Sequence, residues 1–173
     1  MARVVELRRH TDNDGDVLSA EGIARAIEVG ARLHGDYALA VSSGAQRATQ
    51  TIACFQASLG QTIPQGVVVE PRFKSEVEDR WRDAYERGGG GDIASFLEAD
   101  AELVASESAV LSAALADVFE RLPEGARALV VGHSPMQEAA VYGLTGEKVE
   151  PLSKGAGVLV VEESGSYRVE PAE

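Results

Sequence analysis

The amino-acid sequence predicts an α/β fold, a three-layer α/β/α sandwich built around a mostly parallel central sheet. Short runs rich in β-branched residues alternate with longer segments of helical periodicity along most of the 173 residues. Such alternation is typical of strands joined by crossover helices, which then cover both faces of the sheet. With 45% hydrophobic residues the chain can bury a core, and its length suits a single domain over residues 1–173.

The first 71 residues contain five expected elements. We expect strands over residues 2–7, 37–44 and 66–71, and helices over residues 18–35 and 45–60. In the first helix, the residues that recur at a spacing of three and four are Ile23, Ala26, Ile27, Gly30 and either Ala31 or Leu33. Ser19 suits its N-cap, while Gly35 and Gly60 suit the ends of the two helices. Pro71 should end the third strand, because proline lacks the N–H that a sheet needs.

The second half begins with a highly charged segment that ends in four glycines, residues 88–91. We interpret it as a loop or a short helix from about Ser75 to Arg87, followed by a flexible link. The remaining expected elements are a helical stretch over 92–125 with a break near Asp100, a strand over 126–135, a short helix over 136–146 and a closing hairpin around Ser164-Gly165-Ser166.

Composition and charge exclude several classes of function. The net charge of −12 repels polyanions, so we expect no nucleic-acid partner and no binding to an anionic membrane surface. No stretch approaches the roughly 20 apolar residues of a membrane span. No secretory signal is visible, so we expect a cytoplasmic location. The single cysteine, Cys54, excludes an internal disulfide and is interpreted as a buried, inert thiol.

One metal-binding pattern is rejected. The stretch from His10 onward matches part of a calcium-binding EF-hand loop. The residues at fitting positions are Asp12, Asp14, Gly15 and Glu21. Calcium requires an oxygen ligand at the first position, however, and the preceding segment is a predicted strand rather than a helix. We interpret these acids as a solvated rim.

Four side chains that can bind phosphate follow predicted strands. Arg9 and His10 end the first strand, and His133 ends the strand over 126–135. Arg47 lies in the first turn of the helix that follows the second strand. Because ligands of open α/β sheets bind beyond the carboxyl ends of strands, we expect these four side chains to meet at one edge.

Two arginines and two histidines in one pocket predict phosphoryl chemistry. Guanidinium groups pair with phosphate oxygens through two hydrogen bonds, and helix N-termini add N–H donors. A neutral imidazole beside such a pocket is a competent nucleophile toward phosphorus. Because guanidinium groups repel divalent cations, we expect no metal and no cofactor.

These residues also carry a resemblance to a known family. The motifs LRRHTD, LSAEGIARA, VSSGAQRATQTIA and VVGHSP stand in this order, over about residues 4 to 60 and 126 to 161. Together they resemble the histidine phosphatase superfamily, the phosphoglycerate-mutase-like group. The resemblance implies the phosphoglycerate-mutase-like fold, and the compact length is similar to that of the small phosphohistidine or phosphoprotein phosphatases of this superfamily.

The resemblance implies a role for each of the four residues. His10 would be the nucleophile that accepts the phosphoryl group. Arg9 and Arg47 would clamp the phosphoryl oxygens, and His133 would hold the group during transfer. Members of the superfamily hydrolyse phosphomonoesters or related phosphoryl groups through a phosphohistidine without a metal, and some transfer the group within a sugar acid instead.

The chain departs from the family pattern around the proton donor. Ser134 follows the second histidine, where the acid-phosphatase branch has an aspartate. Larger branches use a glutamate from the segment after the third strand. Glu76 is the nearest match here, with Glu78 and Asp79 as neighbours. A poor leaving group needs such an acid, whereas a phosphohistidine substrate, with its good leaving group, needs it less.

The chain departs from the family motif at two further positions, and three other side chains are given non-catalytic roles. Thr11 stands where many members have glycine, and Glu6 interrupts the first strand. Arg8 points away from Arg9 in a strand, which favours a rim position or an ion pair. The two remaining side chains are Ser43, interpreted as a turn or cap residue, and His34, placed in the last helical turn without a catalytic role.

The sequence therefore predicts a metal-independent phosphatase that acts on a phosphorylated small molecule or a phosphoprotein through a phosphohistidine at His10. Its activity should fall at acid pH, because the imidazole must be unprotonated to attack. Two alternatives stay open: a phosphoglycerate-type mutase, and an inactive phosphate-binding regulatory module. The sequence names neither the leaving group nor the oligomeric state.

Overall fold

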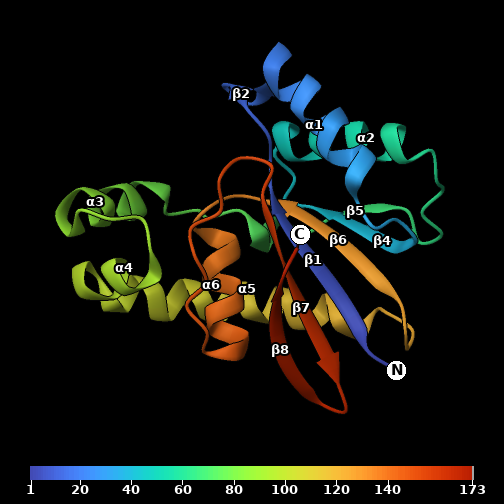
Figure 1. The fold of residues 1–173 in the computed structure, drawn as a ribbon. Coiled ribbons are helices and arrows are strands. Elements are labelled where there is room, and N and C mark those ends of the chain that lie inside the picture. Colours follow the sequence, from blue (N-terminus) through green and yellow to red (C-terminus); the bar gives the residue numbers. More distant parts are fainter. Residues whose placement is uncertain (173) are drawn as a thin grey trace.

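A computed structural model describes residues 1–172 of the chain. A six-stranded sheet lies at the centre with helices on both faces, so the predicted three-layer α/β/α architecture is confirmed (Figure 1). The strands of this sheet are β1 (Arg3–Arg9), β4 (Tyr37–Ser42), β5 (Val67–Val69), β6 (Arg127–Gly132), β7 (Gly157–Glu163) and β8 (Ser166–Pro171). The helices are α1 (Ala20–Arg32), α2 (Gln46–Leu59), α3 (Glu78–Gly88), α4 (Ile93–Ala99), α5 (Ala101–Glu120) and α6 (Met136–Thr145).

The order of the strands brings the ends of β1, β4 and β6 together. The order across the sheet is β5-β4-β6-β1-β7-β8. The first four of these strands are parallel, while β7 runs antiparallel to β1 and β8 runs antiparallel to β7. The carboxyl ends of β1, β4 and β6 therefore share one edge of the sheet, and β7 begins at that same edge.

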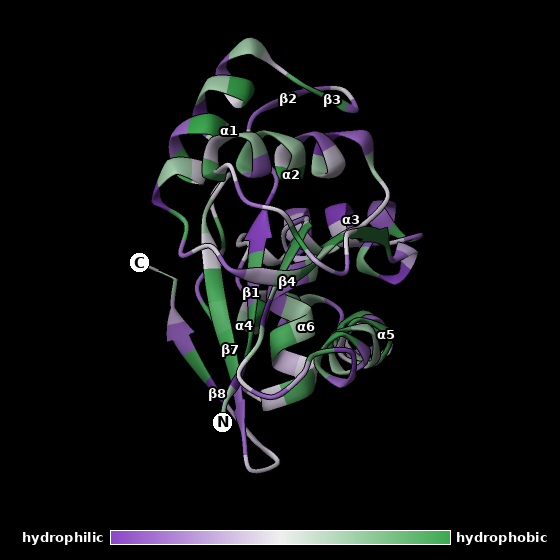
Figure 2. Ribbon diagram, turned by 90° about the vertical axis from the view of Figure 1, so that its right-hand side faces the viewer, coloured by the Kyte–Doolittle hydropathy of each residue, from purple (hydrophilic) through white to green (hydrophobic). Residues whose placement is uncertain are grey.

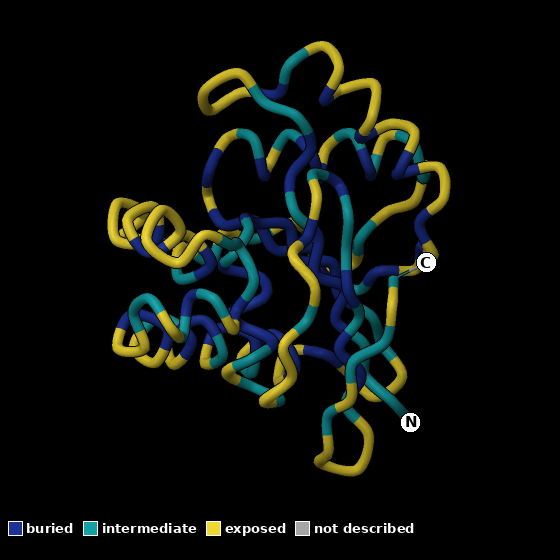
Figure 3. Tube along the Cα trace, turned by 60° about the vertical axis from the view of Figure 1, so that its left-hand side comes forward, coloured by how far each residue is buried: buried dark blue, intermediate teal, exposed yellow. Residues whose placement is uncertain are grey.

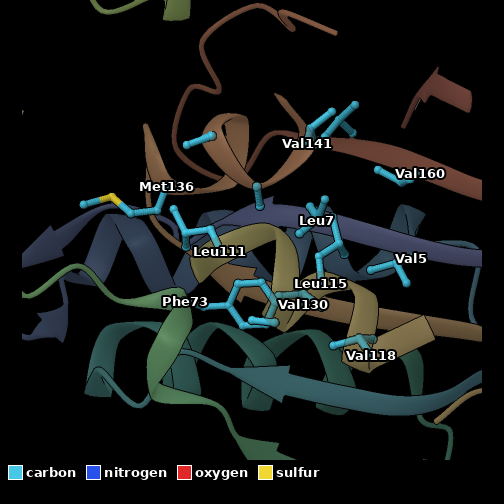
Figure 4. Packing of buried hydrophobic residues seen from close by; sticks show 14 of the residues in the cluster. Val5, Leu7, Phe73, Leu111, Leu115, Val118, Val130, Met136, Val141 and Val160 are labelled. Carbon is cyan, nitrogen blue, oxygen red and sulfur yellow. The ribbon is translucent and has the colours of Figure 1, made fainter. Parts of the chain in front are cut away.

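Two hydrophobic clusters hold the layers together. Alternate residues of a strand face opposite sides of a sheet. In β4, Leu39 and Val41 belong to the larger cluster, whereas Ala40 belongs to the smaller one. The larger cluster packs α5 and α6 against one face of the sheet (Figure 4), and the smaller packs α1 and α2 against the other. Figure 2 shows hydrophobic residues along the strands and hydrophilic residues interleaved along the outer helices.

The buried face of α1 differs from the face that the spacing predicted. A Cβ on Gly22 would lie 1.8 Å from the carbonyl oxygen of Asp12, and one on Gly30 would lie 2.9 Å from the backbone of α2. These glycines therefore let the backbone of α1 approach its neighbours closely. Ile23 and Ile27, which belong to the recurring set, are 44% and 49% exposed, whereas Ala26 and Gly30 of the same set are buried.

Most predicted helix ends are confirmed. Ser19 caps α1, because its hydroxyl accepts a hydrogen bond from a first-turn N–H. Gly60 ends α2 in the left-handed conformation with φ of 66°. Asp100 separates α4 from α5 and caps α5 through its carboxylate. The stop predicted at Gly35 was wrong, because α1 ends at Arg32.

The charged segment forms a helix that begins at Glu78, three residues later than predicted. Ser75 is instead tied to α5, since its hydroxyl donates to Glu107 at 2.5 Å. The same carboxylate accepts from Trp81 Nε1 at 3.1 Å, and the Trp81 ring packs edge-on against Phe96 of α4 with centroids 5.0 Å apart. These contacts hold α3 and α4 beside the body of the fold, on the left of Figure 1.

Three smaller elements complete the chain. A two-stranded hairpin, β2 (Asn13–Asp14) and β3 (Val17–Leu18), follows β1, where only a rim of acids was predicted. A 3-10 turn over Pro71–Phe73 follows β5, as proline at the end of that strand suggested. The closing β7–β8 hairpin is confirmed, with its turn at Ser164 and Gly165.

Burial is deepest along the central strands (Figure 3). None of the helices in residues 1–172 has the length and apolarity to cross a membrane.

Candidate active site

The ends of three parallel strands meet as expected. The register aligns Arg9 of β1 with Gly132 of β6, and Ser42 of β4 with the neighbouring Val131. The backbone N–H of His10 donates to the carbonyl of Gly132 at 3.0 Å, which locks the end of β1 to β6. Because the strands end level with one another, the residues that follow them share one edge.

A cavity of about 500 Å³ opens at this edge. All four of the predicted phosphate-binding residues line it: Arg9, His10, Arg47 and His133. The other lining residues are Asn13, Gly15, Glu78, Trp81, Arg82, Tyr85, Phe96, Ser134, Pro135, Met136 and Lys154. The structure thus brings together side chains that are up to 145 positions apart along the chain, counting from Arg9 to Lys154.

His10 presents an unprotonated Nε2 toward the cavity. Its Nδ1 lies 2.7 Å from the carbonyl oxygen of Thr11. A carbonyl can only accept, so Nδ1 carries the proton and donates it. Nε2 keeps its lone pair and accepts from Nε of Arg47 at 3.3 Å. His10 is only 5% exposed, so this hydrogen-bond pattern fixes the ring with the lone pair of Nε2 directed at Arg47.

His133 is held in the opposite tautomer. A guanidinium group only donates, so the 3.3 Å contact from Nη2 of Arg47 makes Nδ1 of His133 the acceptor. Nε2 therefore carries the proton and donates to the hydroxyl of Ser43 at 2.8 Å. Ser43 also accepts the N–H of Ala45 at 3.4 Å, so the turn role predicted for it is present beside this second one. The rings of His10 and His133 lie with centroids 5.3 Å apart.

Arg47 connects both imidazoles to the rim. Besides its contacts with the two rings, its Nη1 donates to the exposed carboxylate of Asp16 at 2.8 Å. Arg9 is anchored by a hydrogen bond from Nη1 to the carbonyl of Leu152 at 3.0 Å. Its buried Nε has no partner within the described chain. A buried guanidinium N–H without an acceptor favours an anion as its partner.

Both histidines are held neutral. Burial, together with the positive charges of Arg47 and Arg9, lowers the pKa of His10 to about 4, although its bond to the Thr11 carbonyl opposes this. Burial and the charge of Arg47 lower the pKa of His133 to about 3. Desolvation disfavours the charged form of an imidazole, and nearby cations act in the same direction.

We expect the imidazoles of His10 and His133 to stay unprotonated from pH 8 down to about pH 5 in the free protein, as their lowered pKa values require. Titration of the ring signals by NMR measures this directly, with His10→Ala used for assignment. The two groups are neutral in the folded state and titrate near their ordinary pKa in the unfolded state. Their contribution to stability is therefore present above about pH 6.5 and is lost as the pH falls toward about 4. Ring signals that titrate near pH 6.5 would contradict the arrangement.

The structure does not bring Glu76 into the cavity. Glu76 precedes α3 and lines two other surface hollows together with Lys74. Helix α3 begins at Glu78, so Glu78 is the first acidic residue on the helix face that turns to the cavity. Asp79, the other neighbour considered, also lies outside the cavity lining.

The sequence patterns missed several lining residues. Lys154 lies in the cavity, where its ammonium donates to the side chain of Asn13 at 3.0 Å. It precedes β7, and the antiparallel direction of β7 brings it to the same edge as the end of β1. Trp81 and Tyr85 bring aromatic surface from α3. Their spacing of four along the charged segment was the available signal.

Several nearby polar residues lie elsewhere in the fold. Glu6 and Arg8 form an ion pair at 2.5 Å inside the sheet, and each residue is 2% exposed. Of the two roles predicted for Arg8, the structure therefore shows the ion pair and not the rim position. Tyr37 donates to the same carboxylate at 2.8 Å. Cys54 is half-buried rather than buried, and burial raises the pKa of its thiol. His34 lies just past α1 instead of in its last turn and does not line the cavity.

Residues 1–172 hold no group of three or more His, Cys, Asp or Glu side chains arranged to bind a metal ion. Within the cavity the cationic side chains are Arg9, Arg47, Arg82 and Lys154. Guanidinium and ammonium groups bind oxyanions and disfavour cations. The lining therefore suits a phosphate-like anion.

Comparisons with known proteins support this reading of the fold. No family model and no curated protein matches the sequence. Among solved structures, Bacillus stearothermophilus YhfR is 18% identical with a TM-score of 0.74, covering 98% of this chain and 96% of that one. Phosphoglycerate mutase from Bacillus anthracis is 17% identical with a TM-score of 0.72, over 98% and 92%. The protein histidine phosphatase SixA, solved with tungstate, is 20% identical with a TM-score of 0.60, over 96% and 94%.

Proposed function

We propose, from the premise that this chain has the phosphoglycerate-mutase-like fold of the histidine phosphatase superfamily, that it is a phosphatase with His10 as its nucleophile. The substrate passes its phosphoryl group to Nε2 of His10, and water then hydrolyses the phosphohistidine. The observation that carries the proposal is the pair of neutral imidazoles, 5.3 Å apart, in one cavity with Arg9 and Arg47.

Nε2 of His10 supports the role of nucleophile. It holds a lone pair at neutral pH, because the ring proton is committed to the Thr11 carbonyl and because burial and cations lower the pKa of the ring. In-line attack on phosphorus needs an unprotonated nitrogen within the pocket. Attack forms the P–N bond while the bond to the leaving oxygen breaks.

Arg9, Arg47 and His133 support the role of charge stabilisation. An incoming phosphoryl oxygen can take the place of Asp16 at Arg47 and can satisfy the unpartnered Nε of Arg9. A bound dianion also favours protonation of His133 at Nδ1, which then donates to the phosphoryl group. Donors that are already in place when charge develops lower the barrier most.

The cavity sets the range of substrates. Its volume of about 500 Å³ accommodates a phosphoryl group together with a small organic group or an exposed phosphorylated side chain. We therefore include both a phosphorylated small molecule and a phosphoprotein as substrates in the proposal. We also propose a cytoplasmic location and a reaction that requires no metal. The leaving group would lie along α3, between the aromatic side chains and Lys154.

The test is capture of the phosphoenzyme. Incubation of the intact protein with a radiolabelled aryl phosphate and an alkaline quench should yield a protein label that is stable to alkali and lost in acid, as a phosphohistidine is. Release of inorganic phosphate over many turnovers supports a phosphatase. Transfer of the label back to the dephosphorylated substrate would indicate a mutase. Tight phosphate binding without any label or turnover would indicate a binding module.

A further inference from the structure

The proposed reaction needs a proton donor for any poor leaving group. The cavity lining holds one carboxylate, that of Glu78, and this side chain is exposed on α3. Ser134, which follows His133, also lines the cavity. In the sequence this serine marked the absence of an aspartate, but the structure shows a carboxyl group directly behind it.

That carboxyl group belongs to Glu138, in the first turn of α6. The hydroxyl of Ser134 is hydrogen-bonded to its Oε2. The backbone N–H of Leu152 donates to the same oxygen at 3.3 Å, while the carbonyl of Leu152 holds Arg9. Glu138 is 1% exposed, and its Oε1 has no partner within the described chain. The bond to Ser134 therefore links this buried side chain to the cavity lining.

The surroundings of Glu138 favour a neutral carboxyl group. Burial raises its pKa above the ordinary value. The hydrogen bonds from Ser134 and the backbone N–H groups and the charge of Arg9 all act in the opposite direction, but burial outweighs them. An ionised carboxylate would leave a buried charged oxygen without a hydrogen bond, which is costly. The unpartnered Oε1 thus agrees with a protonated acid.

We propose that Ser134, supplied with a proton by Glu138, protonates the leaving group; this rests on the function proposed above. As Nε2 of His10 bonds to phosphorus, the electron pair of the breaking P–O bond goes to the leaving oxygen. That oxygen takes the Ser134 hydroxyl proton, and Ser134 takes the proton of Glu138, which becomes a carboxylate. In the second step, water attacks the phosphohistidine, and its proton returns through Ser134 to Glu138 as the P–N bond breaks.

The experiment compares two substrates that differ in their need for a proton. p-Nitrophenyl phosphate has a good leaving group, whereas ethyl phosphate has a poor one. We expect Ser134→Ala and Glu138→Gln to lower kcat/KM for ethyl phosphate by about 100-fold and for p-nitrophenyl phosphate by less than about threefold. Ser134→Thr, which keeps the hydroxyl, should retain most of the activity. Glu124→Gln, an exposed residue in the turn before β6, is the matched control.

The pH profile separates a proton role from a structural one. With ethyl phosphate, kcat/KM of the wild-type protein should fall on the alkaline side as Glu138 loses its proton, and Glu138→Gln should remove this limb. Three outcomes would overturn the relay and leave the proposed phosphatase activity intact. The variants could lose activity equally with both substrates, Glu78→Gln could show the selective loss instead, or the wild-type protein could hydrolyse only the aryl ester. A wild-type protein without turnover of either ester would overturn the proposed function, and the relay with it. Thermal unfolding of each variant verifies that it is folded.

Discussion

His10→Ala is expected to lower kcat by at least about 10⁴-fold, because no other group in the cavity replaces the nucleophile. The substitution removes the Nε2 lone pair of His10, which accepts from Arg47 while the ring proton on Nδ1 is donated to the carbonyl of Thr11. Steady-state hydrolysis of p-nitrophenyl phosphate measures the loss. A good leaving group isolates the nucleophile, since that substrate needs little help from an acid.

The matched control is His34→Ala, which removes an exposed imidazole that does not line the cavity. It should leave kcat unchanged. Added imidazole should restore part of the activity of His10→Ala, because the substitution leaves a ring-sized space beside Arg47. A kcat of His10→Ala near that of the wild-type protein would place the nucleophile elsewhere.

Arg47→Ala is expected to lower kcat/KM by about 10²- to 10³-fold, the usual cost of removing a preorganised charge donor. Arg47 is the one side chain in the described residues that contacts both imidazoles, at 3.3 Å each. Its loss would remove a proposed phosphate ligand and also the donor that makes Nδ1 of His133 an acceptor. We expect weaker binding of inorganic phosphate, measured by calorimetry, together with the kinetic loss.

Arg47→Lys should recover only part of this activity. Lysine keeps the charge but presents a point charge in place of the planar fork, so it cannot contact both rings and the phosphoryl group together. Arg32→Ala is the control, since Arg32 lies exposed on α1 and pairs with Glu28 of the same helix. Full activity in Arg47→Lys would indicate that net charge, rather than the bridging geometry, is what the site requires.

The positions of the strands and of their ends could be predicted from the sequence, because short runs of neighbouring residues determine them. A β-branched run such as residues 2–7, followed by polar residues, marks where a strand stops. In a parallel sheet all such stops share an edge. This rule placed His10, Arg47 and His133 together correctly, although they lie in distant parts of the chain. This rule can be applied without knowing which helix packs against which face of the sheet.

The proton donor proposed above could not be found by such rules. Glu76 was chosen as the nearest match to the glutamate that larger branches of the family use after the third strand, but α3 begins at Glu78 and Glu76 lies outside the cavity. Glu138 has the spacing of a core-facing residue on α6, and no local pattern distinguishes it from a buried structural acid. Glu138 stands four residues after Ser134, which lets their side chains meet, but its burial beside Leu152 appears only in the folded chain.

Local patterning therefore specified the α/β class, the shared edge and the two imidazoles with their arginines, because periodicity and strand ends are encoded within a few neighbouring residues. Packing specified the rest: the glycine face of α1, the arrival of Lys154, the tautomers of both rings and the burial of Glu138. Those features depend on distances and solvent exposure that arise only when remote segments of the chain pack together. In the unfolded chain the same side chains have different pKa values and different partners.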